Sequence, residues 1–134
     1  DVDGICSHES FAIDLATHKP MLRELNELFK ARSKRDFSGA SARCFMGFMI
    51  LCDAINRAGS TSPEGIRKAL AETNMPADQL ITPWRGCKFD ETGQNTLADN
   101  VVIQFQGAKP HTVFPFNLAT KEVLFPIPKW SERK

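Results

Sequence analysis

The sequence of 134 residues lacks several features that would indicate a function directly. It contains no tyrosine, and its 17 basic and 16 acidic side chains nearly cancel to a net charge of +1. This balance gives no overall field that would attract nucleic acid or an anionic membrane surface. No run of about 18 or more apolar residues occurs, so we expect no transmembrane helix. With 42% hydrophobic residues, the composition predicts one globular unit over residues 1–134.

The patterns that mark catalytic and metal sites are also missing. Neither Cys-x-x-Cys nor His-x-x-x-His occurs, so no common zinc-binding spacing is present. The histidines, His8, His18 and His111, are scattered without partner spacing. Ser7, His8 and Glu9 are residue types found in hydrolases, but adjacent residues in a loop rarely converge on one reacting atom. We therefore expect no enzyme, no catalytic residue, no metal and no cofactor.

Four cysteines are present, at positions 6, 44, 52 and 87. Cys44 and Cys52 are expected to share a helix, in which eight residues of about 1.5 Å each place them about 12 Å apart. That separation is too large for a disulfide. A bridge between Cys6 and Cys87 stays open, because an even number of cysteines permits disulfides in an oxidising compartment. We favour the alternative that all four are small buried hydrophobic side chains.

Three segments have the pattern of helices. Segment 20–32 has an apolar stripe on one face and a proline in its first turn. Segment 40–58 is apolar nearly all round, which predicts that it is buried on most sides. In a piece of a longer protein, part of that surface would lack its cover and would drive association. Segment 63–73 is the third predicted helix.

A basic cluster at the end of the first predicted helix has two interpretations. Its members are Lys30, Arg32, Lys34 and Arg35. Cations there complement the partial negative charge of a helix C-terminus. A nucleic-acid patch is the alternative, but the cluster lacks interleaved aromatic residues. We therefore predict a helix end and no nucleic-acid partner.

The rest of the chain has the pattern of strands and turns. Residues 2–5 predict a short strand and 7–10 a loop, while 101–106 and 112–116 predict a hairpin with its turn at 107–110. Segment 90–93 predicts a plain turn; a calcium loop is the alternative, but no Glu stands at the required position. Prolines make residues 125–128 extended, and Trp130 is expected to anchor this tail on the surface.

The stretch 53–70 is the most informative part of the chain. Gly59 suits a left-handed helix C-cap, Ser62 can cap the next helix, and Pro63 fits its first position. This stretch resembles solute-binding proteins of the branched-chain amino-acid transport type, the extracellular ligand-binding receptor family. The resemblance continues in order through the following stretches: Asp3-Gly4-Ile5, 89–95, 101–104, Val113-Phe114-Pro115 and 125–130. The resemblance covers nearly the whole chain but only the C-terminal part of a family member. The sequence starts at Asp1 without a methionine or a signal segment, which is expected for a piece of a longer protein.

The resemblance implies an α/β fold, namely a partial type I periplasmic-binding-protein fold with helices, a β-hairpin region and incomplete lobes. In the family, two lobes face each other across a cleft. Residues 7–75 resemble first-lobe material, 1–5 and 84–116 resemble second-lobe strands, and 117–134 form an extended C-terminal tail. Because neither lobe is complete, the chain is expected to form a homodimer by exchange or self-association.

The resemblance also implies a function. Family members capture a small solute in the periplasm by hinge closure and deliver it to a membrane permease of an ABC importer. For this chain the solute is an amino acid or analogue, and the place before the second helix carries the candidate contacts Ala40 and Ser41. Phe45, where relatives often have tyrosine, is a third candidate, although core packing is the alternative. We expect the chain alone not to bind; a sensing or protein-interaction module with the same fold is the rival function.

Overall fold

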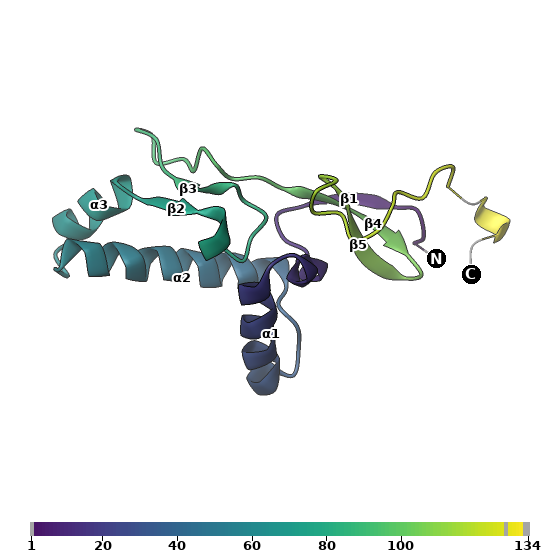
Figure 1. Ribbon diagram of the computed structural model, residues 1–134, viewed down its shortest axis with the longest axis horizontal. Helices are drawn as coiled ribbons and strands as arrows, with labels where there is room; N and C mark the ends of the chain where they lie inside the picture. Colours follow the sequence, from purple (N-terminus) through teal and green to yellow (C-terminus); the bar gives the residue numbers. More distant parts are fainter. Residues whose placement is uncertain (1, 128, 133–134) are drawn as a thin grey trace.

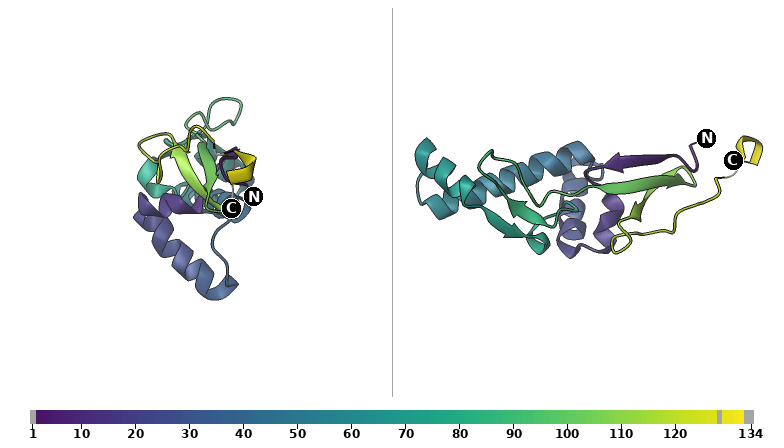
Figure 2. Two further views of the ribbon diagram at one scale, coloured as in Figure 1. Left: turned by 90° about the vertical axis from the view of Figure 1, so that its right-hand side faces the viewer. Right: turned by 90° about the horizontal axis from the view of Figure 1, so that it is seen from above.

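The computed structural model describes residues 2–127 and 129–132 (Figure 1). Helix α2 forms the long axis of an elongated molecule, with α3 and a two-stranded sheet at one end and a three-stranded sheet at the other (Figures 1 and 2). Helix α1 crosses α2 and projects to one side (Figure 1). The elements are β1 (Cys6–Glu9), α1 (Pro20–Ser33), α2 (Gly39–Ala58), α3 (Pro63–Ala71), β2 (Asn74–Pro76), β3 (Gly86–Lys88), β4 (Val101–Gln106) and β5 (Lys109–Phe114), with 3₁₀ helices at Ile13–Thr17, Ala77–Gln79 and Trp130–Glu132.

The three helices begin and end close to the predicted residues. Ser38 caps α2, Gly59 follows it in the left-handed conformation with φ 57°, and the Ser62 side chain accepts from the Gly65 amide at 3.1 Å to cap α3. Pro63 is the first residue of α3, as expected from its missing N–H. Because these signals are local, sequence was sufficient to place the helix boundaries.

The strands differ from the prediction at two places. The first strand is Cys6–Glu9 rather than 2–5, and the predicted loop at 7–10 is therefore wrong in its larger part. This segment pairs antiparallel with β4, with Cys6 opposite Gln104 and Glu9 opposite Val101. Its position is set by pairing with a strand almost 100 residues away, which leaves no signal in the local sequence.

The hairpin of β4 and β5 is confirmed, but its turn is shorter than predicted. Gly107 and Ala108 both have positive φ, 64° and 59°, as in two-residue type I′ turns. Strand β5 therefore begins at Lys109, within the predicted turn 107–110. Pro110 is tolerated because β5 is an edge strand in the order β1-β4-β5.

Helix α2 is buried on one face and exposed on the other, so the prediction that it is buried on most sides is wrong for this chain. The buried stripe repeats every four residues: Ala42, Met46, Ile50 and Ala54. Ala42, Met46 and Ile50 of this stripe belong to the core cluster, together with Leu15, Leu22, Leu80, Ile81 and Val101 among others. On the opposite side Phe48 is 63% exposed, because the described residues supply packing partners for one face alone.

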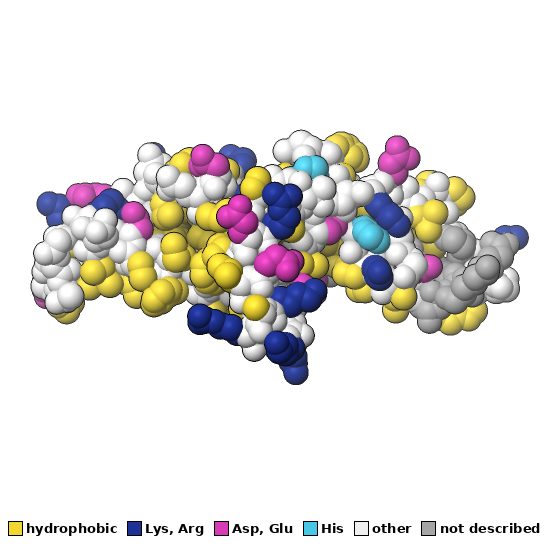
Figure 3. All heavy atoms as spheres, turned by 60° about the horizontal axis from the view of Figure 1, so that its bottom comes forward, with side chains coloured by type: hydrophobic (Ala, Val, Ile, Leu, Met, Phe, Trp, Pro, Cys, Tyr) yellow, Lys and Arg dark blue, Asp and Glu magenta, His cyan; other side chains and the backbone are white. Residues whose placement is uncertain are grey.

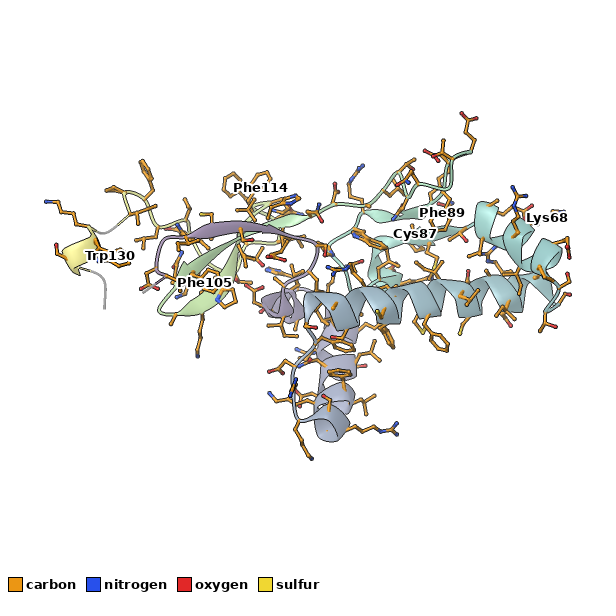
Figure 4. All side chains as sticks on the ribbon, turned by 180° about the vertical axis from the view of Figure 1, so that it is seen from behind. Lys68, Cys87, Phe89, Phe105, Phe114 and Trp130 are labelled. Carbon is orange, nitrogen blue, oxygen red and sulfur yellow. The ribbon has the colours of Figure 1, made fainter. Side chains whose placement is uncertain are left out.

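The cysteine prediction is correct for one residue. All four thiols are free, so no Cys6–Cys87 bridge exists. Cys87 is buried on β3, where Figure 4 labels it, and burial raises the pKa of its thiol. Cys6, Cys44 and Cys52 are exposed, two of them on α2. Cys44 and Cys52 lie on α2, as does the exposed Phe48, and the described residues cover this helix on one side only.

Two polar side chains connect segments that are far apart in the sequence. Asp14 accepts from the Thr112 amide at 2.6 Å and from the Thr112 hydroxyl at 2.8 Å, and the Thr120 hydroxyl also donates to it. The fully buried Gln104 accepts from the Leu124 amide at 2.7 Å and donates to the Leu124 carbonyl at 3.1 Å. Asp14 thus joins the helical part to the sheet, and Gln104 holds the tail against β4.

The tail beyond residue 117 follows the prediction in part. It contains no strand among its described residues, and Trp130 keeps 72% of its surface exposed. Pro128, part of the predicted extended segment, lies outside the described residues. None of the helices in the described ranges is long and apolar enough to cross a membrane.

The turn at Asp90 is a plain β-turn, as predicted. The Asp90 carboxylate accepts from the Thr92 hydroxyl at 2.6 Å, the Thr92 amide at 2.9 Å and the Gln94 amide at 3.0 Å. These bonds, the one from the Thr92 side chain first, hold the pKa of Asp90 below its usual value. The described residues contain no cluster of three potential metal ligands.

The Asp14 contacts predict a large loss of stability in the Asp14→Asn variant. This change removes the charge and replaces one of the two acceptor oxygens by an NH2 donor, which then faces at least one of the three donors. The free energy of unfolding should therefore fall by about 2–3 kcal/mol. Urea unfolding followed by circular dichroism measures it. Glu91→Gln is the control, because Glu91 is exposed and its charge loss should change stability by less than about 0.5 kcal/mol. Equal midpoints for both variants would contradict the structural role of Asp14.

The Asp90 turn predicts a pH-dependent contribution to stability. A carboxyl with a lowered folded pKa stabilises the fold above its unfolded pKa, and the contribution is lost as pH falls through the folded value. The stability difference between wild type and Asp90→Asn should therefore shrink from about pH 5 to about pH 2. Urea midpoints across this range measure it. A difference independent of pH would show that the carboxylate charge has no role in the turn.

Candidate functional site

The candidate residues Ala40 and Ser41 lie in the first turn of α2. The Ser41 hydroxyl accepts from the Ser38 amide at 2.8 Å and donates to the Ser38 carbonyl at 3.1 Å. The Ser41 amide in turn donates to the Ser38 hydroxyl at 3.3 Å. This reciprocal capping box satisfies backbone groups that the start of a helix leaves unpaired. The Ser41 side chain therefore already has a structural role.

Two amides at the same helix end have no partner. The N–H groups of Gly39 and Ala40 form no hydrogen bond within the described part of the chain. The start of a helix carries a partial positive charge, which favours a carboxylate or another anion. Ala40 is exposed and Ser41 half-buried, so both are accessible from solvent.

The loop that leads into α2 is fixed by side chains from α1. Asn26, which is buried, donates to the Asp36 carboxylate at 2.8 Å and accepts from the Phe37 amide at 2.8 Å. Lys30 lies 3.0 Å from the same carboxylate. The hydrogen bond from Asn26 and then that from Lys30 hold the pKa of Asp36 below its usual value. The contacts orient the first turn of α2.

A polar hollow of about 420 Å³ opens beside this turn. It lies between the end of α1, the loop and the start of α2, and its lining residues are Phe29, Ser33, Arg35, Asp36, Ser38 and Ser41. Arg35 can attract a carboxylate. The Asp36 carboxylate already pairs with Lys30 and accepts from Asn26, so the hollow favours an anionic group, which it surrounds from one side only.

Phe45 faces a different, apolar hollow of about 560 Å³ between α1 and α2. Its ring lies 5.8 Å from that of Phe37, which stacks on Phe29 at 4.3 Å. Phe45 is half-buried and packs against the core. The structure thus brings Ser41 to the polar hollow, whereas Ala40 and Phe45 are absent from its lining.

Sequence reasoning missed Arg35 and Asp36 as lining residues. Arg35 was assigned to the basic cluster at a helix end, Asp36 was assigned to no site, and no local pattern shows that a loop residue faces a hollow. The basic cluster otherwise follows the helix-end interpretation, since Lys30 pairs with Asp36 and Lys34 donates to the Ala31 carbonyl at 2.9 Å.

Comparisons with known proteins were made for the sequence and for the fold. No family model matches the chain. It is 27% identical over 117 residues to the Leu/Ile/Val-binding protein homolog 7 of Brucella abortus (strain 2308), which covers 87% of this chain and 29% of the relative. It is 28% identical over 127 residues to the Leu/Ile/Val-binding protein homolog 8 of Brucella suis biovar 1 (strain 1330), which covers 92% and 31%.

The fold is similar to that of a solved structure, the leucine binding protein LivK of Thermotoga maritima MSB8. The TM-score is 0.65 at 22% sequence identity, and the match covers 83% of this chain and 30% of that one. The chain therefore spans about 30% of the length of the proteins that it matches. These findings confirm the resemblance inferred from the stretch 53–70 and the partial periplasmic-binding-protein fold: over most of its length the chain is similar to a part of proteins named Leu/Ile/Val-binding protein homologues, and its fold is similar to a part of a leucine binding protein.

Proposed function

We propose that the chain is part of the substrate-binding component of an ABC importer for amino acids or a related small solute. The observation that carries the proposal is sequence similarity over 87–92% of the chain to Leu/Ile/Val-binding protein homologues. The partial fold of a leucine binding protein agrees with it. In this function the component works in the periplasm and delivers its solute to a membrane permease.

The proposed solute contacts are Ala40, Ser41 and Phe45. The free amides of Gly39 and Ala40 belong to the same turn as Ser38 and Ser41, which line the polar hollow together with Arg35. In the proposed site this turn receives the carboxylate of an amino acid. The Ser41 hydroxyl gives its one proton to the Ser38 carbonyl, so it would donate to the solute by turning that proton away from Ser38. Phe45 offers apolar surface on the next turn of α2. The polar hollow is open to solvent on its other side, so a second wall is needed to enclose the solute.

The two-lobe arrangement is part of the proposal. Residues 7–75 belong to the first lobe, 1–5 and 84–116 to the second, and 117–134 form the C-terminal tail. Asp14 supports a junction between these parts, because it bonds Thr112 and Thr120 across 98 and 106 residues of sequence. Closure of the lobes around a solute would act at such a junction.

A protein-interaction or ligand-sensing module with the same fold is the second candidate. The observation that favours it is the exposed apolar surface of α2, where Phe48 and Met49 are 63% and 41% exposed. Surface of this kind commonly marks an interaction site. In this function the contact with a partner would replace delivery of a solute.

The one-sided hollow predicts that the chain alone does not bind amino acids. Isothermal titration with leucine, isoleucine and valine should show no binding with a dissociation constant below about 100 µM, because a solute would keep much of its surface in water. Arginine at the same concentration serves as a control for nonspecific heats. Micromolar binding of any of the three amino acids would show that the site is complete.

A chimera tests the function and the contact residues separately. The chain replaces the matched part of the Brucella abortus homolog 7, and the chimera is titrated with the same amino acids. We expect binding, and Ser41→Ala should weaken it by roughly tenfold through the loss of one hydrogen bond to a charged group. Ser62→Ala is the control, because it also removes a helix cap but lies at α3.

The outcomes of the chimera experiment are distinct. A folded chimera that binds no amino acid contradicts the proposed function. A chimera whose affinity is changed equally by Ser41→Ala and Ser62→Ala contradicts the proposed contact while leaving the function in place. Circular dichroism of each chimera establishes that it is folded before titration.

A further inference from the structure

The exposed side of α2 carries a row of uncharged residues, here called the outer face. Its members are Cys44, Phe48, Leu51, Cys52 and Ile55. Each residue turns a helix by about 100°, so these side chains lie within about 60° of Phe48 and opposite the buried stripe. Figure 3 shows hydrophobic side chains gathered along this side of the molecule, and in Figure 4 side chains project from α2 away from β2 and β3.

The outer face consists of residue types that proteins bury most often. Cysteine, isoleucine, leucine and phenylalanine are all among them. Here Phe48 is 63% and Leu51 38% exposed, and both cysteine thiols of α2 are exposed as well. Single exposed apolar side chains are ordinary, but a row of them on one helix marks a surface that another group of residues covers.

Charge distinguishes the outer face from the exposed faces of the other two helices. The charged residues of α2, which are Arg43, Asp53 and Arg57, all lie about 140–180° around the helix from Phe48. The exposed sides of α1 and α3, in contrast, carry the following charged residues: Arg23, Glu24, Glu27, Lys30, Arg32, Glu64, Arg67 and Lys68. Covering the outer face therefore removes no charged group from water, and its desolvation cost is small.

The uncovered apolar surface extends into the corner between α1 and α2. Apolar hollows of about 560 and 280 Å³ lie there, and Leu28 at their edge is 67% exposed. Met49 lines the smaller hollow and connects it to the outer face. Native interiors leave few voids larger than a water molecule, so we expect a cover that fills this corner with its own side chains.

The exposed area of the outer face is small for an interface between separate molecules. Phe48, Met49 and Leu51 are 63%, 41% and 38% exposed, and at about 200 Å² for each side chain they present less than about 300 Å². A standard interface buries about 800 Å² on each partner, because association must offset lost translational and rotational freedom. A cover in the same polypeptide avoids most of that cost. The homodimer expected from the sequence therefore stays a prediction.

The proteins that match this chain contain enough further polypeptide for such a cover. The match spans 29% of homolog 7, 31% of homolog 8 and 30% of the LivK chain. More than two thirds of each of these proteins lies outside the match, and this remainder is here called the unmatched part. The unmatched part is joined covalently to the matched stretch, whereas a second copy is not.

We infer that the outer face of α2 is an internal surface, which the unmatched part of a Leu/Ile/Val-binding protein polypeptide covers in a longer protein. The cover places apolar side chains opposite Phe48, because an unpaired charge buried there would be costly. The exposure of Phe48 and Met49 then reflects a missing cover and not a docking site for a separate protein. The inference rests on the same sequence similarity as the proposed function, but it does not depend on solute binding.

Alkylation of the two thiols on α2 measures the cover directly. N-ethylmaleimide adds to cysteine thiolates that it can reach, and Cys44 and Cys52 are both exposed in this chain. The chimera with Brucella abortus homolog 7, described above, supplies the unmatched part. Both thiols should react in the isolated chain at a rate independent of protein concentration. In the chimera they should react at least roughly tenfold more slowly, because the cover must open before the reagent can enter.

A buried thiol and a pair of variants are the controls. Cys87 is fully buried in this chain, so its slow reaction establishes that each protein is folded, and urea should make it react. Phe48→Glu places a charge in the covered face and should restore fast reaction of Cys44 and Cys52 in the chimera. Phe116→Glu should not, because Phe116 is exposed on the loop after β5 and lies outside the outer face.

Three results would overturn the inference. Fast reaction of Cys44 and Cys52 in a folded chimera would show that the unmatched part leaves the outer face open. Slow reaction in the isolated chain that becomes slower as its concentration rises would identify a second copy as the cover. Equal effects of Phe48→Glu and Phe116→Glu would show that protection reflects general stability and not contact with this face.

The same measurements separate this inference from the proposed function. None of them needs a solute. A chimera that protects both thiols but binds no amino acid contradicts the proposed function alone. A chimera that binds an amino acid while Cys44 and Cys52 react fast contradicts the inference alone.

Discussion

The packing of one face of α2 is the constraint on which the rest of the structure depends. The stripe of Ala42, Met46, Ile50 and Ala54 is the surface against which the core gathers, and it sets the long axis of the molecule. Burial of this stripe also fixes which side of the helix remains open. The same interaction therefore holds the chain together and leaves an apolar surface to be covered by something else.

Polar contacts connect segments of the chain that the hydrophobic core does not join. Asp14, Arg57 and Gln104 each bond groups outside their own element: Asp14 bonds the sheet, Arg57 bonds Thr73 just before β2, and Gln104 bonds the tail. Hydrogen bonds to charged or buried groups are among the stronger ones in proteins, because the alternative leaves a polar group unpaired. An elongated chain with a modest core depends on such contacts to keep its ends in place.

The candidate site follows from the same arrangement. Asn26 and Lys30 on α1 hold Asp36, Ser38 caps α2, and the amides of Gly39 and Ala40 have no partner among the described residues. The result is one wall of a polar hollow beside the start of α2, a helix end that carries a partial positive charge. Its incompleteness and the open outer face of α2 agree with a chain that spans about 30% of the proteins it matches.

The sequence by itself determined the helices, their caps and the hairpin, because Ser62, Pro63, Gly59 and the turn at Gly107 act through neighbouring backbone. It also determined the family resemblance. Tertiary structure alone decided that β1 lies at Cys6–Glu9, that Arg35 and Asp36 line a hollow, and that Cys44 and Cys52 are exposed. These features depend on which segments meet in the folded chain. The apolar pattern along α2 indicates that much of its surface packs against other residues, but it does not indicate whether those residues belong to this chain.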